Sequence, residues 1–337
     1  MAGPKILTDR QMSRRLRLHD LFVFSTVAQH QSMAKAAAEL GVAQPTISEV
    51  IANLEHAYDV RLFDRSPRGV ELTVYGEALL KRSVAVFDEI NQSAKDMQFL
   101  ADPTVGEVRI ACVEGLSGTV LPEMIRHFTR RCPNVVLYVD NLTSSRADMV
   151  GLRNRQYDLA LLRRDSSMLM DENLSVQTLY DDDVMIIAAG MNTRWACQPV
   201  ISLADLLDEP WILPPPGYWH HTRVEEAFRE LGFSLPKARI VVSSGVSLRM
   251  QLMSDGPYIS VFTNSVMRHN AHRFGIAALP INLPSKPWPV VLVTLKNRTQ
   301  SAAVERFIES VRQVANSLSA QGRTAMTATG RTDQSAQ

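Results

Sequence analysis

The chain has 337 residues, which at about 150 residues per domain predicts roughly two domains. Hydrophobic residues make up 45% of the chain and charged residues 21%, with a formal net charge of +1, which excludes a disordered chain and a strongly basic nucleic-acid coat. The three cysteines are too few and too widely spaced for a disulfide framework, and no apolar run is long enough to span a membrane, so we expect a cytoplasmic protein.

A helix-turn-helix is predicted near the N-terminus. Apolar residues recur at helical spacing over residues 16–29, and Ser32 is a favourable N-cap for the alanine-rich segment 33–40. Gly41 suits the left-handed position that ends a helix, and Pro45 suits the first turn of the next helix. Two short helices joined by a tight glycine turn are typical of a helix-turn-helix, although an ordinary helical hairpin in a helical core is the alternative.

The second of these helices, residues 45–58, separates apolar and polar side chains onto two faces. Ile47, Ile51 and Leu54 share the apolar face, while small polar residues gather at the N-terminal end. In a helix-turn-helix this end meets base edges and phosphates. We therefore expect DNA contacts from this helix and from the start of the preceding one: Ser32, Lys35, Gln44, Pro45, Thr46, Ser48 and Glu49.

A small hairpin is predicted directly after these helices, with strands at 61–65 and 70–72. The intervening turn has Pro at its second position and Gly at its fourth, as a type I turn favours. Arg65 and Arg68 lie near its tip, where they would reach phosphates or a minor groove, although either one alone could simply be solvated. A hairpin at this place is a wing, so we predict a winged helix-turn-helix over residues 16–73.

One long helix is predicted from Val74 to Leu100, after the capping residue Thr73. Its apolar stripe, which includes Val86 and Ile90, has to be buried against another surface. Pairing with the same helix of a second chain would bury it, and packing along its own domain is the alternative. We assign residues 74–102 to a linker that forms a homodimer.

Strand and helix patterns alternate over residues 103–318, which predicts an α/β domain with mostly parallel strands. Ligands of such sheets bind beyond the carboxyl ends of strands, close to helix N-termini. Three loops at such positions offer hydroxyl and backbone N–H donors, although any single serine there could instead cap a helix. The expected ligand-binding residues are Glu114, Gly115, Ser117, Thr119, Ser144, Ser145, Ser244, Val246 and Ser247.

The ligand that these loops favour is a small organic anion, such as a sugar acid or an aromatic acid, because no run of arginines suits a phosphate. The paired histidines at 220–221 and at 269 and 272 lack a third ligand nearby, so we expect solvated rings and no metal. No nucleotide-binding phosphate loop is present, and we expect no cofactor. Residues 319–337 are rich in small polar residues and are predicted to be disordered.

Segments 32–40, 43–48, 54–55, 62–65 and 72–76 resemble, in order and spacing, the LysR-type transcriptional regulators. The resemblance implies a winged helix-turn-helix, a long linker helix, and a two-lobed α/β effector domain similar to periplasmic solute-binding proteins. It also implies that the chain crosses between the lobes near 181–184 and again near 261–264.

For function, the resemblance implies a transcriptional regulator without enzymatic activity that binds double-stranded promoter DNA as homodimers and homotetramers under control of a small effector. The family often has a basic residue directly after the position of Ser48, where this chain has Glu49, a carboxylate that can accept a hydrogen bond from cytosine N4. The alternative is a solute-binding or enzymatic α/β protein whose N-terminal helices serve only assembly. Salt-dependent DNA binding by residues 1–100 would distinguish the two.

Overall fold

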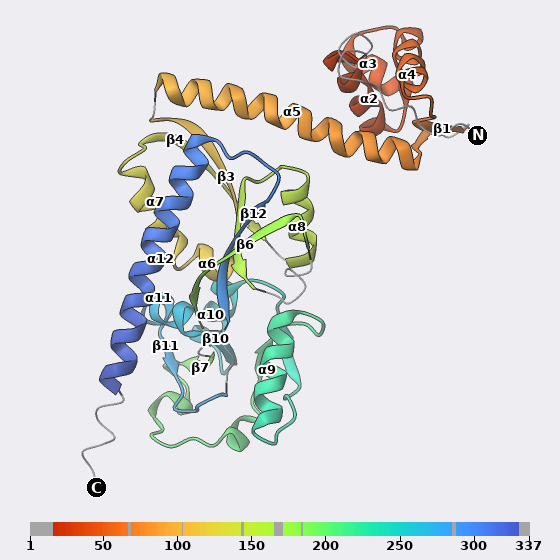
Figure 1. The fold of residues 1–337 in the computed structure, drawn as a ribbon. Coiled ribbons are helices and arrows are strands. Elements are labelled where there is room, and N and C mark those ends of the chain that lie inside the picture. Colours follow the sequence, from red (N-terminus) through yellow and green to blue (C-terminus); the bar gives the residue numbers. More distant parts are fainter. Residues whose placement is uncertain are drawn as a thin grey trace. The chain divides into compact units, whose positions relative to one another are not determined.

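The computed structural model describes residues 16–66, 69–102, 104–142, 145–164, 171–182, 185–284 and 288–329. The chain forms two compact units, Met1–Ala94 and Lys95–Gln337, and the boundary between them falls within one long helix (Figure 1). None of the helices in the described ranges combines the length and apolar character needed to cross a membrane.

In its described residues, the N-terminal unit has three short helices and a hairpin, followed by the start of the long helix. Its elements are α2 (Leu18–His30), α3 (Met33–Leu40), α4 (Gln44–Tyr58), β1 (Phe63–Ser66), β2 (Gly69–Leu72) and α5 (Val74–Ala101). The predicted helix-turn-helix, hairpin and long helix are thus confirmed. Val23, Phe24 and Ile51 belong to one buried core, which apolar side chains of all three short helices and of the hairpin share.

Local hydrogen bonds explain where these elements begin and how the hairpin is held. The Ser32 hydroxyl accepts a hydrogen bond from the Lys35 backbone N–H at 3.3 Å, and Gly41 ends α3 at a φ of +65°. The Glu55 carboxylate accepts from the backbone N–H groups of Leu62 and Phe63 at 2.8 and 3.3 Å. Glu55 therefore connects α4 directly to the base of the hairpin.

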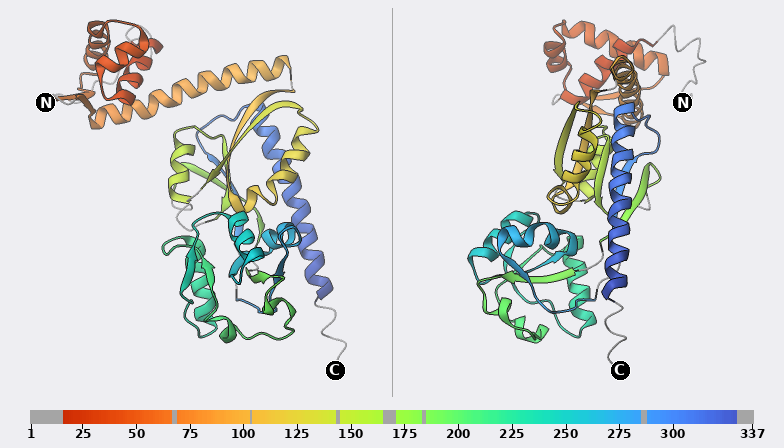
Figure 2. Two further views of the ribbon diagram at one scale, coloured as in Figure 1. Left: turned by 180° about the vertical axis from the view of Figure 1, so that it is seen from behind. Right: turned by 90° about the vertical axis from the view of Figure 1, so that its left-hand side faces the viewer.

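The C-terminal unit contains two five-stranded sheets, which define two lobes (Figure 2). Lobe 1 has strand order β4-β3-β5-β12-β6 and consists of β3 (Val105–Val113), α6 (Glu114–Ser117), α7 (Leu121–Thr129), β4 (Asn134–Leu142), α8 (Ser145–Arg153), β5 (Leu159–Arg163), β6 (Leu174–Asp181), β12 (Pro289–Leu295) and α12 (Ala302–Thr329). Lobe 2 has order β11-β7-β10-β8-β9 and consists of β7 (Met185–Gly190), two short 3-10 helices (Arg194–Cys197 and Leu203–Leu206), β8 (Trp211–Leu213), α9 (Trp219–Glu230), β9 (Ala238–Val241), α10 (Val246–Asp255), β10 (Ile259–Thr263), α11 (Asn264–Phe274) and β11 (Ile276–Ala278).

Both sheets are mixed: four strands of each run in one direction, as predicted, and one strand runs against them. In lobe 1, β12 runs antiparallel to both β5 and β6, and in lobe 2, β7 runs antiparallel to both β10 and β11. Each of these strands is the one that follows a crossing from the other lobe. Because the crossing chain enters at the carboxyl ends of the parallel strands, the new strand has to run in the opposite direction.

The first crossing lies where it is expected, because β6 ends at Asp181 in lobe 1 and β7 begins at Met185 in lobe 2. The second expected crossing, near 261–264, is wrong. Residues 264–274 form α11, which buries Val266 and Met267 in the core of lobe 2, and β11 then pairs with β7. The chain therefore returns to lobe 1 only between β11 and β12.

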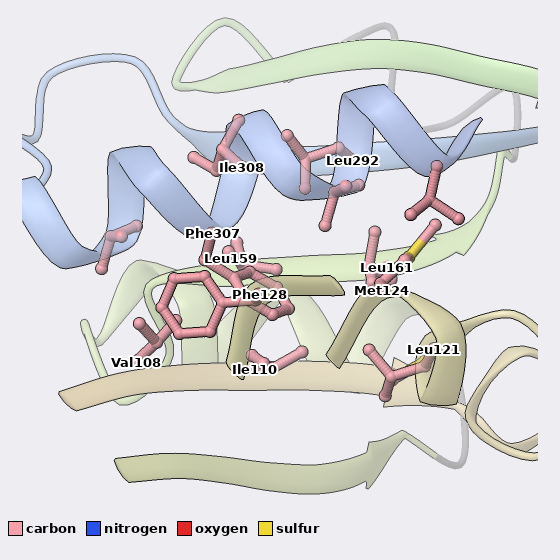
Figure 3. Close-up of a cluster of buried hydrophobic side chains, with 14 of the residues drawn as sticks. Val108, Ile110, Leu121, Met124, Phe128, Leu159, Leu161, Leu292, Phe307 and Ile308 are labelled. Carbon is pink, nitrogen blue, oxygen red and sulfur yellow. The ribbon is translucent and has the colours of Figure 1, made fainter. Parts of the chain in front are cut away.

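The core of lobe 1 lies between its sheet and helices α7 and α12 (Figure 3). Val108 and Ile110 of β3 point into it, and the rings of Phe128 and Phe307 pack edge to face with centroids 5.2 Å apart. Helix α12 extends to Thr329, so the disorder predicted from residue 319 does not begin there. Alanine, glutamine and arginine in this segment all favour a helix, and the segment contains no proline.

Candidate DNA-binding surface and interlobe cleft

The N-terminal end of α4 is an exposed polar surface. Gln44, Pro45, Thr46 and Glu49 are all exposed, whereas the apolar face of the same helix is buried. Ala43 precedes the helix in an extended conformation and offers no capping side chain. Pro45 has no backbone N–H, and the Thr46 N–H donates to the Ala43 carbonyl at 3.0 Å, so this surface offers mainly side chains to a partner.

The remaining predicted DNA-contacting residues of the helices differ in exposure. Lys35 is exposed on α3. The Ser32 hydroxyl is engaged in capping α3, and the half-buried Ser48 directs its hydroxyl to the Met33 Sδ at 3.4 Å. These two hydroxyls thus have partners within the unit, while Lys35 faces solvent.

The hairpin presents Arg65 on its exposed side. Arg65 is exposed on β1 opposite Val70, whose backbone N–H donates to the Gln31 carbonyl at 3.0 Å. This bond and the two bonds to Glu55 hold the hairpin against the helices. Arg68 lies outside the described residues.

A cleft lies between the two lobes, at the edge where the parallel strands of both sheets end. Its wall is mainly apolar. It is lined by Val113, Glu114, Gly115, Leu142 and Arg163 of lobe 1, by Met185, Pro214, His220, Val224, Val242, Ser243, Ser244, Gly245, Val246, Arg249, Val261, Phe262, Thr263 and Val266 of lobe 2, and by Trp288 before β12.

Arg163, the last residue of β5, forms a buried ion pair that connects the lobes. Its Nη2 donates to the Asp182 Oδ2 at 2.5 Å and to the Thr263 hydroxyl at 3.1 Å, and both charged side chains are at most 5% exposed. Asp182 also accepts from the backbone N–H and the hydroxyl of Ser265. The Arg163 Nη1 is buried and has no hydrogen-bond partner in the described part of the chain.

Arg249 lies one turn into α10 and is the second cation of the cleft. Its Nη1 donates to the Val261 carbonyl at 3.2 Å, and its guanidinium lies 4.4 Å from the centre of the Phe262 ring. Burial lowers the pKa of Arg249 to about 10, while the charge of Glu114 acts in the opposite direction. Arg249 therefore stays protonated near neutral pH.

His220 and Trp288 form an aromatic corner beside these arginines. Their rings pack edge to face with centroids 5.7 Å apart, and the Arg163 guanidinium lies 5.0 Å from the centre of the Trp288 ring. Burial, followed by the charges of Arg249 and Arg163, holds the pKa of His220 well below its usual value. His220 is thus half-buried, with its ring packed against Trp288, and neutral at neutral pH, so the expectation of a solvated ring is wrong at this position.

The predicted ligand-binding residues are only partly at the cleft. Glu114, Gly115, Ser244 and Val246 line it, and Glu114 accepts a hydrogen bond from the Gly245 backbone N–H across the lobes. The remaining residues are not part of the lining as described. The hydroxyls of Ser117 and Thr119 donate to the Glu114 and Gly115 carbonyls at 3.1 and 2.7 Å, and Ser247 is exposed. Ser144 lies outside the described residues, and Ser145 begins α8 with a side chain that is not described.

Sequence reasoning missed Arg163, Arg249, His220 and Trp288. One signal was available for Arg163, because a charged residue that ends a fully apolar strand lies at the edge where α/β sheets bind ligands. No comparable signal marked Trp288, which reaches the cleft only because the chain returns to lobe 1 there.

The described residues contain no cluster of side chains suited to hold a metal ion. Cys112 is fully buried in the core of lobe 1, and burial raises the pKa of its thiol, whereas Cys197 is exposed. Cys112 therefore has the properties of a core residue.

Two family models match the chain. The LysR substrate binding domain matches residues 101–316, and the bacterial regulatory helix-turn-helix protein of the lysR family matches residues 18–77. The transcriptional dual regulator GltC of Bacillus subtilis is 28% identical over 300 residues, which cover 88% of this chain and 97% of GltC. The regulator GbpR of Azospirillum brasilense is 24% identical over 304 residues, which cover 89% of this chain and 87% of GbpR.

Solved structures show the same fold. CbnR, a LysR family transcriptional regulator, superimposes with a TM-score of 0.58 at 22% identity, covering 89% of this chain and 99% of CbnR. A full-length OxyR variant of Pseudomonas aeruginosa gives a TM-score of 0.60 at 21% identity, covering 88% of this chain and 95% of OxyR. With the helix-turn-helix, the two-lobed domain and both family models in agreement, the chain belongs to the LysR family and is a DNA-binding transcriptional regulator, not an enzyme, controlled by a small molecule that binds its C-terminal domain.

Proposed function

We propose that the effector is a small organic anion and that Arg163 anchors it in the interlobe cleft. The observation that carries this proposal is the Nη1 atom of Arg163, a residue of the cleft lining: this atom is buried and has no hydrogen-bond partner in the described chain. An unsatisfied buried donor on a charged group costs about 1–3 kcal/mol or more, and an anion that accepts from it removes that cost. Carboxylates match the fork geometry of a guanidinium.

The rest of the cleft favours an apolar body on this anion. Valine, leucine and methionine contribute eight of the 20 lining residues, and Pro214, Phe262 and Trp288 add further apolar surface. Such a surface favours an aromatic or branched acid over a sugar acid, whose hydroxyls would each need a hydrogen-bond partner when buried. The expected contacts from the predicted set are those with Glu114, Gly115, Ser244 and Val246.

On the DNA side, we propose that α4 enters the major groove of promoter DNA with its exposed N-terminal end. Gln44, Pro45, Thr46 and Glu49 have the exposure that base contact requires, and the partially positive N-terminal end of the helix suits a phosphate. Arg65 and Arg68 would contact phosphates or the minor groove, and Lys35 adds a further cation. Ser32 and Ser48 complete the predicted set, although both of their hydroxyls have partners within the protein.

For assembly, we propose a homodimer formed through α5 and a homotetramer built from two dimers, in the cytoplasm. Val86 and Ile90 of α5 are 38% and 45% exposed, and a second copy of this helix would cover them. Two DNA-binding units in one assembly would bind two half-sites, and the effector would shift the assembly between two arrangements on DNA.

A thermal-shift screen of small carboxylic acids against their amides tests the anion proposal. A ligand that binds only the folded protein raises its unfolding temperature. We expect at least one acid to stabilise the full-length protein while its uncharged amide does not, and the Arg163→Lys variant to lose this difference. Equal stabilisation of both proteins by that acid would contradict the assignment of Arg163.

A further inference from the structure

The side-chain carboxylate of Glu114 is part of the cleft lining. Glu114 follows β3 of lobe 1, and its Oε2 accepts from the backbone N–H of Gly245, the residue that begins α10 in lobe 2. Arg249, in the first turns of α10, lies close enough to Glu114 for that charge to act on its guanidinium. The partially positive end of a ten-residue helix thus meets this carboxylate, whose charge also acts on the half-buried Arg249.

Charge balance in the cleft depends on that carboxylate. Arg163 is paired with Asp182, the charge of Glu114 acts on Arg249, and burial keeps His220 neutral. An additional anion would therefore add an uncompensated negative charge to a largely buried site, which is costly. If the carboxylate of the effector instead takes the place of the Glu114 carboxylate, the net charge of the cleft stays unchanged.

A second observation shows that the cleft can hold an incoming anion. The Arg163 Nη1 is a buried donor without a partner in the described residues, and Arg163 belongs to the same cleft lining as Gly245. Because this donor comes from lobe 1, it is independent of the α10 N-terminus, which belongs to lobe 2.

We propose that Glu114 is a built-in competitor of the effector, and that the carboxylate of the effector displaces it from the N-terminus of α10. The proposal rests on the proposed function of the cleft as the binding site for an organic anion. Glu114 and Gly245 belong to different lobes, so the displacement removes a link between the lobes when the effector binds. Effector binding would in this way be converted into a change in how the lobes are held together.

Formate, the smallest carboxylate, tests this exchange in the full-length protein. Thermal unfolding of the C-terminal unit is followed during a sodium formate titration, with sodium chloride at equal ionic strength as the reference. In Glu114→Ala the α10 N-terminus is vacant, so we expect formate to raise the unfolding temperature at concentrations at least tenfold lower than in wild type. Glu123→Ala, which removes an exposed glutamate of α7, is the matched control and should respond as wild type does.

Glu114→Gln keeps the shape of the side chain and provides the readout if Glu114→Ala does not fold. Its amide competes less well than a carboxylate, so its response to formate should lie between those of wild type and Glu114→Ala. If both Glu114 variants respond no more strongly than wild type and Glu123→Ala, the proposal is overturned. The two proposals can fail separately. If Glu114→Ala responds more strongly to formate while Arg163→Lys is still stabilised by the acid as wild type is, then Glu114 competes with the effector but Arg163 does not anchor it.

Discussion

The DNA-binding surface and the effector cleft use opposite ways of placing functional groups. The predicted DNA contacts all lie between Ser32 and Arg68, on adjoining helices and one hairpin, and several are exposed on α4. The cleft takes its groups from residues as far apart as Val113 and Trp288, and its charged groups are buried or half-buried. A surface that reads a large external partner can be built from local structure, whereas a site that encloses a small molecule requires the whole topology.

The largest effect is expected on the exposed apolar face of α5, which the proposed dimer buries. Ile90→Asp places a charge on the proposed dimer face of α5, and an unpaired buried carboxylate costs several kcal/mol. We expect smaller species in sedimentation velocity and at least a hundredfold loss of affinity for DNA with two half-sites. Asn91→Asp adds the same charge at the neighbouring exposed position and should leave the mass unchanged. A wild-type mass for Ile90→Asp would show that α5 does not form the dimer.

On the buried side, Arg163→Lys should weaken binding of an acid identified in the screen by about 1.5–3 kcal/mol, or roughly ten- to a hundredfold. Lysine keeps the charge that compensates Asp182 but lacks a second terminal nitrogen for the ligand. Calorimetry measures the loss. Arg153→Lys changes an arginine that pairs with Asp171 near the surface of the same lobe, so it should bind normally. Equal affinities of the two variants would contradict the prediction.

A smaller effect is expected on the DNA side, where single exposed contacts are weak. Arg65→Ala should lower affinity for all DNA sequences and reduce the slope of log affinity against log salt by about one unit. Fluorescence anisotropy at several salt concentrations measures both. Arg229→Ala removes an exposed arginine from lobe 2 and serves as the control. An unchanged slope for Arg65→Ala would remove the hairpin from the DNA interface.

The smallest effect is expected at Ser247, which is exposed and absent from the described cleft lining. Ser247→Ala should change acid binding by less than about 0.5 kcal/mol. Ser244→Ala, at a serine that does line the cleft, is the comparison and should weaken binding more. A loss at Ser247 comparable to that of Arg163→Lys would place the ligand against the exposed side of the first turn of α10.

The sequence was sufficient for the N-terminal unit because each of its elements carries local signals. Ser32 and Gly41 mark the ends of α3, and the hairpin has a turn with proline and glycine at suitable positions. Helical periodicity then assigns the two faces of α4 without any knowledge of the rest of the chain.

The cleft was less predictable because long-range pairing decides which strand ends meet. The hydroxyl-rich loops suggested Ser117 and Ser247, but a hydroxyl near a helix start satisfies its own backbone as readily as it binds a ligand. The direction of each strand could not be predicted from the sequence either, since the reversed strands β7 and β12 are as apolar as their parallel neighbours. Only the order of the strands in each sheet shows that both follow a crossing between lobes.

The placement of β12 also has a consequence for the order in which the lobes fold during synthesis. Lobe 2 is continuous from Met185 to Ala278, so all of its strands have been translated before β12 is made. Lobe 1 lacks the strand that lies between β5 and β6 until Leu295 has left the ribosome. Until then β5 and β6 each have an unpaired edge, which favours aggregation of incomplete chains. A chain that terminates between residues 284 and 288 would therefore contain a complete lobe 2, including the core residues Leu279 and Leu283, attached to an open lobe 1.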